Sequence, residues 1–269
     1  MTTHRTMEND MTAHDALTVL KVGGARLAST ADLERLADQV ASLRRQGQQA
    51  IVVHGGGPEI SDLHDRLGIP FEKVDGLRAT SVEGLQATVM VLCGAVRTRI
   101  VERMTSRGLD SLGVSGVDLG LLRAPFADEQ RLGRVGGPPV VDEAAFRRLL
   151  ATGATLVVSP VSIGPDGSAV NVNADDAAHA IATALGARSL DFVSDIPGVR
   201  TDADRVARRL GPTAITDLIA SGAVRGGMVP KLKAAVAAVR AGVDRVRIGD
   251  LTSMAAGRAT VITAEESLS

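Results

Sequence analysis

Short runs of apolar residues alternate along the chain with longer stretches in which apolar residues recur every three or four positions. The short runs have the length and composition of buried β-strands, and the clearest are LTVLKV, AIVVH and SLDFV. One longer stretch, TADLERLADQVASLRRQG, predicts an amphipathic helix with Ser29 or Thr30 as its N-cap and Gly47 as its end. This alternation indicates an α/β protein, and we expect a three-layer αβα sandwich with a mostly parallel central sheet.

The middle of the chain carries the longest helical pattern. Residues 81–108 predict one long helix whose centre, ATVMVLCGAV, is too apolar to be wholly exposed, so we expect part of it to form an interface. The Gly- and Pro-rich residues 132–139 predict a hairpin or a mobile connection. ADDAAHAIATALG predicts a further helix, entered from a polar Asn-Asp cluster.

The chain has 269 residues, which exceeds the usual size of one domain, but α/β folds of this length often form one unit. We interpret residues 15–269 as a single domain with two lobes and a boundary near residue 180. Residues 1–14 are polar and predict a disordered leader.

Glycine turns follow several of the predicted strands and are the main candidates for chemistry. Lys21 lies just before Gly23 and Gly24, the strand AIVVH runs into GGG, and Lys231 follows another glycine pair at the start of an Ala-rich helix. Glycine lets backbone N–H groups approach phosphate oxygens, and lysine supplies positive charge. Two lysines and three glycine turns therefore favour a phosphoryl-transfer site, although no GxxxxGK[ST] loop and no protein-kinase signature is present.

Composition excludes several classes of function. Thirty basic and thirty-one acidic residues give a formal charge of -1, and the chain has four Phe but no Trp or Tyr, so nothing favours binding to nucleic acid or an anionic membrane. The single Cys93 cannot form an internal disulfide, and the five His residues show no metal-ligand spacing, so we expect no dedicated metal site. The N-terminus lacks an apolar signal region, which predicts a cytoplasmic, soluble protein.

The order of motifs resembles that of the amino acid kinase family, and most closely its N-acetylglutamate kinase branch. The motifs that carry the resemblance are KVGG, VVHGGGPE, DGLRAT, VNVNADDAA, VSDIPGV and GGMVPK. They are spread from residue 21 to residue 231, and the similarity covers nearly all of the chain after residue 15. The resemblance implies the amino acid kinase fold, with an N-lobe (15–180) for the acyl substrate and dimerisation and a C-lobe (181–269) for the nucleotide.

The resemblance also implies a role for each matched position. Lys21 and Lys231 would stabilise the phosphoryl group in flight, and Asp175 would organise the two lysines. Binding of the acylamino acid is expected at Gly56, Gly57, Arg78 and Asn171. Arg78 suits a carboxylate because its planar fork forms two parallel hydrogen bonds. The nucleotide is expected to contact Gly23, Gly24, Asp195, Ile196, Pro197, Gly198, Val199, Arg200, Ala223, Val224 and Arg225.

The expected reaction is attack of an N-acylated acidic amino acid on MgATP, with Mg²⁺ held mainly by the nucleotide. Departures from the family pattern concern the periphery: Ser81, Ala95 and Arg97 replace the usual residues, and the region after Asp250 is short. The leader also lacks the long N-terminal helix of hexameric relatives, which favours a homodimer. A kinase for a carrier-linked glutamate or aminoadipate, and a non-catalytic regulatory relative, remain as alternatives.

Overall fold

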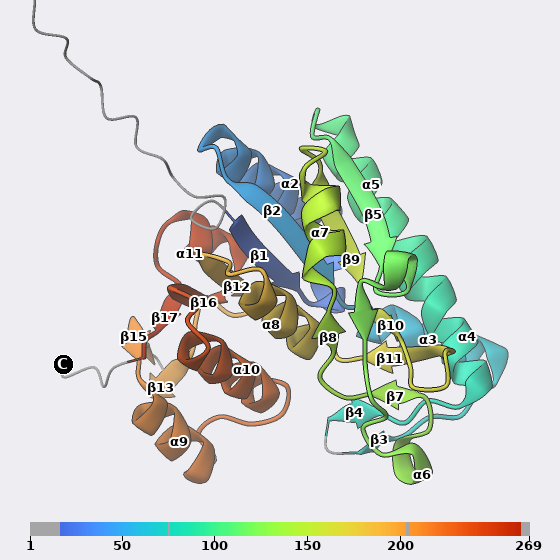
Figure 1. Cartoon of the computed structure of the whole chain (residues 1–269). Helices are drawn as coiled ribbons and strands as arrows, with labels where there is room; N and C mark the ends of the chain where they lie inside the picture. Colours follow the sequence, from blue (N-terminus) through green and yellow to red (C-terminus); the bar gives the residue numbers. More distant parts are fainter. Residues whose placement is uncertain (1–16, 75, 203–204, 265–269) are drawn as a thin grey trace, which may run out of the picture.

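The computed structural model describes residues 17–74, 76–202 and 205–264, and a large sheet forms the centre of the molecule (Figure 1). Within these residues its strands follow the order β15, β17, β16, β12, β1, β2, β9, β5, and all neighbours are parallel except β16 and β17. The strands are β1 (Leu17–Val22), β2 (Gln49–His54), β5 (Ser111–Ser115), β9 (Thr155–Ser159), β12 (Ser189–Val193), β15 (Arg209–Leu210), β16 (Arg245–Gly249) and β17 (Thr260–Ile262).

Helices cover both faces of this sheet, because successive residues of a strand point to opposite sides. In β1, Leu17 and Val19 pack with one group of helices, whereas Leu20 and Val22 pack with the other. The first group is α7 (Glu143–Leu150), α8 (Ala174–Ala184), α9 (Pro212–Ala220) and α10 (Met228–Arg240). The second group is α2 (Thr30–Arg45), α3 (Gly57–Leu67), α5 (Arg97–Ser106) and α11 (Leu251–Ala255). The predicted αβα sandwich with a mostly parallel sheet is confirmed.

A smaller sheet and two hairpins lie beside the main sheet. The smaller sheet has the order β7 (Val135–Gly136), β11 (Ala169–Val172), β10 (Val161–Ile163), β6 (Leu122–Arg123), β8 (Val140–Val141). The hairpins are β3 (Lys73–Val74) with β4 (Leu77–Arg78), and β13 (Arg200–Asp202) with β14 (Arg205–Val206). Residues 132–139 do not form a hairpin of their own. They contain β7 and lead to β8 at the opposite edge of the same sheet, as the connection between the two edges.

The predicted long helix is present but is not a continuous α-helix. It consists of α4 (Val82–Val89), a π-helical segment η2 (Met90–Val96) and α5. By length and composition alone, Val82–Ser106 could cross a membrane, and it is the only such helix among the described residues. Its buried residues contribute to the core: Val91, Leu92, Val96, Ile100 and Met104. Its last part, α5, packs along β5 and β9.

Local sequence signals explain the element boundaries. Helix α2 begins after Ser29, whose hydroxyl accepts a hydrogen bond from the Asp32 N–H, and the chain turns at Gly47 with φ of 75°. Both predictions for this helix are confirmed. The predicted lobe boundary near residue 180 falls inside α8, and the predicted leader lies outside the described residues.

Candidate active site

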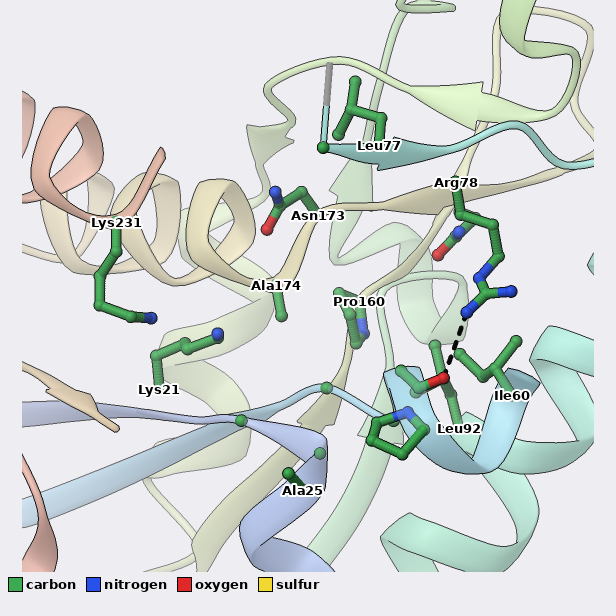
Figure 2. A pocket seen from close by; sticks show the side chains of 18 of the residues that line it. Lys21, Ala25, Ile60, Leu77, Arg78, Leu92, Pro160, Asn173, Ala174 and Lys231 are labelled. Atoms are coloured by element: carbon green, nitrogen blue, oxygen red, sulfur yellow. Dashed lines mark hydrogen bonds between the residues drawn. The ribbon is translucent and has the colours of Figure 1, made fainter. Parts of the chain in front are cut away.

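The carboxyl ends of β1, β2 and β12 open into a cavity of about 440 Å³. In parallel sheets ligands bind at this edge, because the loops after the strands surround the same space. Nine of the residues expected from the sequence line the cavity: Lys21, Gly23, Gly24, Gly56, Gly57, Arg78, Asn171, Asp195 and Lys231. Figure 2 shows Lys21 and Lys231 pointing toward one another, with Arg78 on the other side of the cavity.

Lys21 and Lys231 meet on a single carboxylate. The Lys21 Nζ lies 2.9 Å from Asp175 Oδ1, and the Lys231 Nζ lies 3.1 Å from the same oxygen. The three residues come from β1, α8 and α10, and α8 and α10 pack on the same face of the sheet. Asn173 sets the start of α8, since its Oδ1 accepts a hydrogen bond of 2.8 Å from the Asp175 N–H. The fold thus brings all three residues together.

The charges of this cluster are partly buried, and their pKa values shift accordingly. Burial disfavours ionisation of Asp175, but attraction from Lys21 and Lys231 outweighs it, so the pKa of Asp175 falls below its ordinary value. Burial, with repulsion from Lys21, lowers the pKa of Lys231 to about 8. At neutral pH Lys231 and Asp175 are therefore both charged.

Two of the glycine turns touch directly. A Cβ on Gly24 would lie 2.7 Å from Gly56 Cα and 2.8 Å from the Gly57 N, so only glycine fits at residue 24. A Cβ on Gly56 would lie 2.8 Å from Leu92 Cδ2 of the π-helical segment. Gly23 has no such neighbours within 4 Å. These turns therefore line the cavity with backbone alone, without side chains between it and a ligand.

Arg78 is held by three partners at the far side of the cavity. Its Nη2 donates hydrogen bonds to the Ser61 Oγ at 2.6 Å and to the Gly57 carbonyl at 3.2 Å. Its guanidinium carbon lies 3.8 Å from the centre of the Phe71 ring. The Nη1 atom is buried and has no hydrogen-bond partner.

Asn171 lies on β11 near the same part of the cavity. Its side-chain amide donates a 3.5 Å hydrogen bond to the Thr80 Oγ1, which follows Arg78 in the chain. Its backbone N–H donates to the Arg134 carbonyl. Asn171 and Arg78 are therefore linked through Thr80, and both side chains belong to the same part of the cavity wall.

The residues expected around the nucleotide are less closely grouped. Asp195 is exposed and lines the cavity, whereas 196–200 and 223–225 are not part of its wall. Gly198 packs against Thr260 and Val206, and the Val199 N–H donates to the Thr260 hydroxyl. Ala223 and Arg225 are exposed, while Val224 is buried. These segments lie outside the cavity wall and remain predictions as nucleotide contacts.

Sequence reasoning missed one residue that lines the cavity and two that hold Arg78 in place. Ser61 and Phe71 hold Arg78, and Arg26 lines the cavity two residues after Gly24. None belongs to a glycine turn or to the quoted motifs. Arg26 could have been noticed as a second basic residue close to Lys21, whereas the positions of Ser61 and Phe71 depend on folding.

His54 is buried and supports the glycine turn that follows it. Its Nε2 lies 2.9 Å from the Ser159 Oγ, and that hydroxyl donates to the Leu92 carbonyl of the π-helical segment. Burial lowers the pKa of His54 to about 4, so the ring is neutral at neutral pH. The pair links β2 and β9 to the segment whose Leu92 contacts Gly56.

Comparison with known proteins agrees with this geometry. The Amino acid kinase family matches residues 16–250, and the chain belongs to this family. It is 44% identical over 250 residues to an acetylglutamate kinase of Chloroflexus aggregans, covering 92% of this chain and 97% of that protein.

Solved structures show the same fold. The smu.665 protein of Streptococcus mutans UA159 has a TM-score of 0.84 and 26% identity, covering 94% of this chain and all of that one. Carbamate kinase from Giardia lamblia bound to AMP-PNP has a TM-score of 0.71 at 14% identity, with 94% and 100% coverage. The expected amino acid kinase fold is confirmed.

Proposed function

We propose that this protein uses ATP to phosphorylate the side-chain carboxylate of N-acetyl-L-glutamate, as a step of arginine biosynthesis. The observation that carries the proposal is one cavity that joins a two-lysine cluster to a fixed arginine. A phosphoryl group fits the first and an acidic amino acid fits the second. The 44% identity to an acetylglutamate kinase over nearly the whole chain supports the same substrate, and the AMP-PNP complex of the carbamate kinase supports ATP as the donor.

In this reaction a carboxylate oxygen of the acceptor attacks the γ-phosphorus of ATP. The bond from that phosphorus to the β–γ bridging oxygen breaks, its electron pair leaves with ADP, and the product is an acyl phosphate. No general base is required, because the nucleophile is already ionised. Lys21 and Lys231 neutralise charge on the transferring group, and Asp175 keeps them at one point.

Binding of the two substrates is assigned to opposite sides of the cavity. Arg78 binds a carboxylate of the acceptor, and Asn171 and the N–H groups of Gly56 and Gly57 bind its polar atoms. Gly23 and Gly24 hold phosphate oxygens. The rest of the nucleotide is assigned to Asp195, Ile196, Pro197, Gly198, Val199, Arg200, Ala223, Val224 and Arg225.

Mg²⁺ is proposed to enter with the nucleotide. The described residues contain no group of three or more His, Cys, Asp or Glu side chains that could hold a metal ion, so the donor set fits an ion bound mainly by phosphate oxygens. When bound, Mg²⁺ neutralises phosphate charge. The chain's own residues position the two substrates around it.

We also propose a cytoplasmic homodimer. Apolar side chains are exposed on the long helix and around β5, which is the last strand of the main sheet: Val82, Met90, Leu112, Val117 and Leu119. An edge strand flanked by exposed apolar residues suits pairing with a second copy. Mass measurement by light scattering on the wild type and on Met90→Lys tests the dimer, which the lysine should weaken.

A hydroxylamine trap tests the reaction, because acyl phosphates react with hydroxylamine to give hydroxamates, which form coloured complexes with Fe³⁺. The purified protein is incubated with MgATP and, separately, N-acetylglutamate, glutamate, aspartate or N-acetylaminoadipate. Hydroxamate formed only with N-acetylglutamate supports the proposal, and the Lys231→Met variant should form little. Nucleotide binding without product from any free acid would overturn it in favour of a carrier-linked acceptor or a regulatory protein.

A further inference from the structure

Arg26 is a further cation that lines the cavity, in addition to Lys21, Lys231, Arg78 and Lys73. Arg26 lies on the short helix α1 (Gly24–Leu27), on the turn that follows Gly23 and Gly24. The position of α1 is fixed at both ends, since Gly24 touches Gly56 and Leu27 is buried. The Arg26 side chain therefore starts from a rigid base close to the backbone N–H groups that are assigned to phosphate.

Arg26 also borders a second, smaller cavity. This space of about 50 Å³ is lined by Arg26, Asp32, Arg35, Val193, Ser194, Asp250, Leu251 and Thr252. Val193 and Ser194 line the main cavity as well. Arg26 thus lines both cavities, together with Val193 and Ser194 at the end of β12.

The hydrogen bonding of Arg26 is incomplete. Its Nη1 donates to Asp32 Oδ2 at 3.1 Å, but its Nε is buried and has no partner. Asp32 is shared, because Arg35 donates to its other oxygen at 2.9 Å. Asp250 lines the small cavity as well, so the two arginines there face two aspartates. A buried N–H without an acceptor nevertheless costs free energy. An anion at this point would supply the missing acceptor.

We infer that Arg26 binds the β- or γ-phosphate of the nucleotide, as a phosphate-binding residue in addition to the two lysines. The inference rests on the proposed use of ATP. Asp32 holds the guanidinium near the glycine turn in the free protein, and the triphosphate completes its hydrogen bonding. Asp32 is itself fixed, since its backbone N–H is bound by the N-cap Ser29.

The chain offers a matched control in Arg35. Arg35 pairs with the same carboxylate as Arg26 but is absent from the wall of the main cavity. Arg26→Met and Arg35→Met therefore remove the same charge from Asp32, and only the first removes a donor from the cavity. A role confined to the ion pair would make the two variants alike.

The test measures dissociation constants of ATP, ADP and AMP by calorimetry for the wild type and both variants, with melting curves as a check of folding. Arg26→Met should weaken ATP about tenfold and leave AMP within about twofold, as expected for one charge-assisted hydrogen bond. ADP should weaken to the same extent if Arg26 binds the β-phosphate and should be unchanged if it binds the γ-phosphate. Arg35→Met should leave all three nearly unchanged. Equal losses in the two variants, or an equal loss for AMP, would overturn the inference.

A second variant and the hydroxylamine trap separate the role of Arg26 from a folding defect and from the proposed acceptor. If Arg26→Met does not fold, Arg26→Lys keeps the charge without the guanidinium fork and should weaken ATP about threefold, again sparing AMP. Unchanged ATP binding in Arg26→Lys would contradict the inference. Because no acceptor is present, a failure of the hydroxylamine trap would overturn the proposed acceptor while leaving the role of Arg26 standing.

Discussion

The two sides of the cavity are held by different kinds of contact. Arg78 is fixed by the Gly57 carbonyl, the Ser61 hydroxyl and the Phe71 ring. Lys21 and Lys231 are long, flexible side chains that share a single oxygen of Asp175. A carboxylate has a fixed planar shape, which a rigid guanidinium can match, whereas a phosphoryl group in flight changes position, which point charges can follow. The comparison suggests that one side selects the acceptor and the other stabilises the reaction.

Removing a lysine should give the largest effect. Lys231→Met deletes one of two charges on the transferring group, so we expect kcat to fall about 10²- to 10³-fold, with ATP affinity changed far less. Lys233→Met is the matched control, because this lysine is exposed on the same helix. Steady-state kinetics and nucleotide calorimetry separate the two quantities. Near-normal kcat in Lys231→Met would contradict the assignment of Lys231 to the transferring phosphoryl group.

Arg78 should affect the acceptor and spare the nucleotide. Arg78→Ala removes a charge-assisted hydrogen bond, so KM for N-acetylglutamate should rise about 10- to 100-fold, while the ATP dissociation constant stays within about twofold. Arg66→Ala serves as the control, since that side chain is 73% exposed on α3. Equal effects of Arg78→Ala on both substrates would show that the two sides do not act separately.

Activity should fall at high pH. The pKa of Lys231 is lowered to about 8 by burial and by Lys21, and lysine is charged only below its pKa. In the free enzyme kcat/KM should therefore decline above about pH 8 and be roughly tenfold lower at pH 9. Lys231→Arg, which stays charged, should lose this decline. A flat wild-type profile up to pH 9.5 would contradict the assigned role of the Lys231 charge.

The contact between the two glycine turns should make the protein sensitive to substitution of Gly24 and insensitive to substitution of Gly23. In Gly24→Ala the new Cβ meets backbone atoms of Gly56 and Gly57 at 2.7 and 2.8 Å, so we expect a loss of about 1–3 kcal/mol in stability and a few-fold loss of activity. Gly23→Ala meets nothing within 4 Å and should melt like the wild type. Indistinguishable melting temperatures would show that the two turns can separate without cost.

Features with a local cause could be predicted from the sequence, and features that depend on distant partners could not. The strand LTVLKV, the cap at Ser29 and the turn at Gly47 follow from neighbouring residues, and all three appear in the structure. Lys21 and Lys231 stood out because each lies within a few residues of a glycine pair. Their shared contact with one oxygen of Asp175 could not be predicted in this way, because it depends on how β1, α8 and α10 are arranged in space.

The misses have equally specific reasons. Residues 132–139 contain turn residues, which favoured a hairpin. In the structure β7 pairs with β11 and β8 pairs with β6, and these pairings depend on the order of strands in the smaller sheet. Ser61 and Phe71 are ordinary residues whose contacts with Arg78 arise only when α3 and the hairpin of β3 and β4 meet. The π-helical segment within residues 81–108 has no composition that separates it from an α-helix.

That π-helical segment sets the orientation of everything after it. Relative to an unbroken α-helix, one extra residue rotates the following side chains by about 100° around the axis. In α5 this orientation directs Arg99 to Glu59, in the first turn of α3 next to Gly57. The segment thus works as an angular spacer, because the number of residues between Val89 and Arg97 decides which face of α5 meets α3. A single deletion there would turn that face away from α3 without shortening the helix by more than a fraction of a turn.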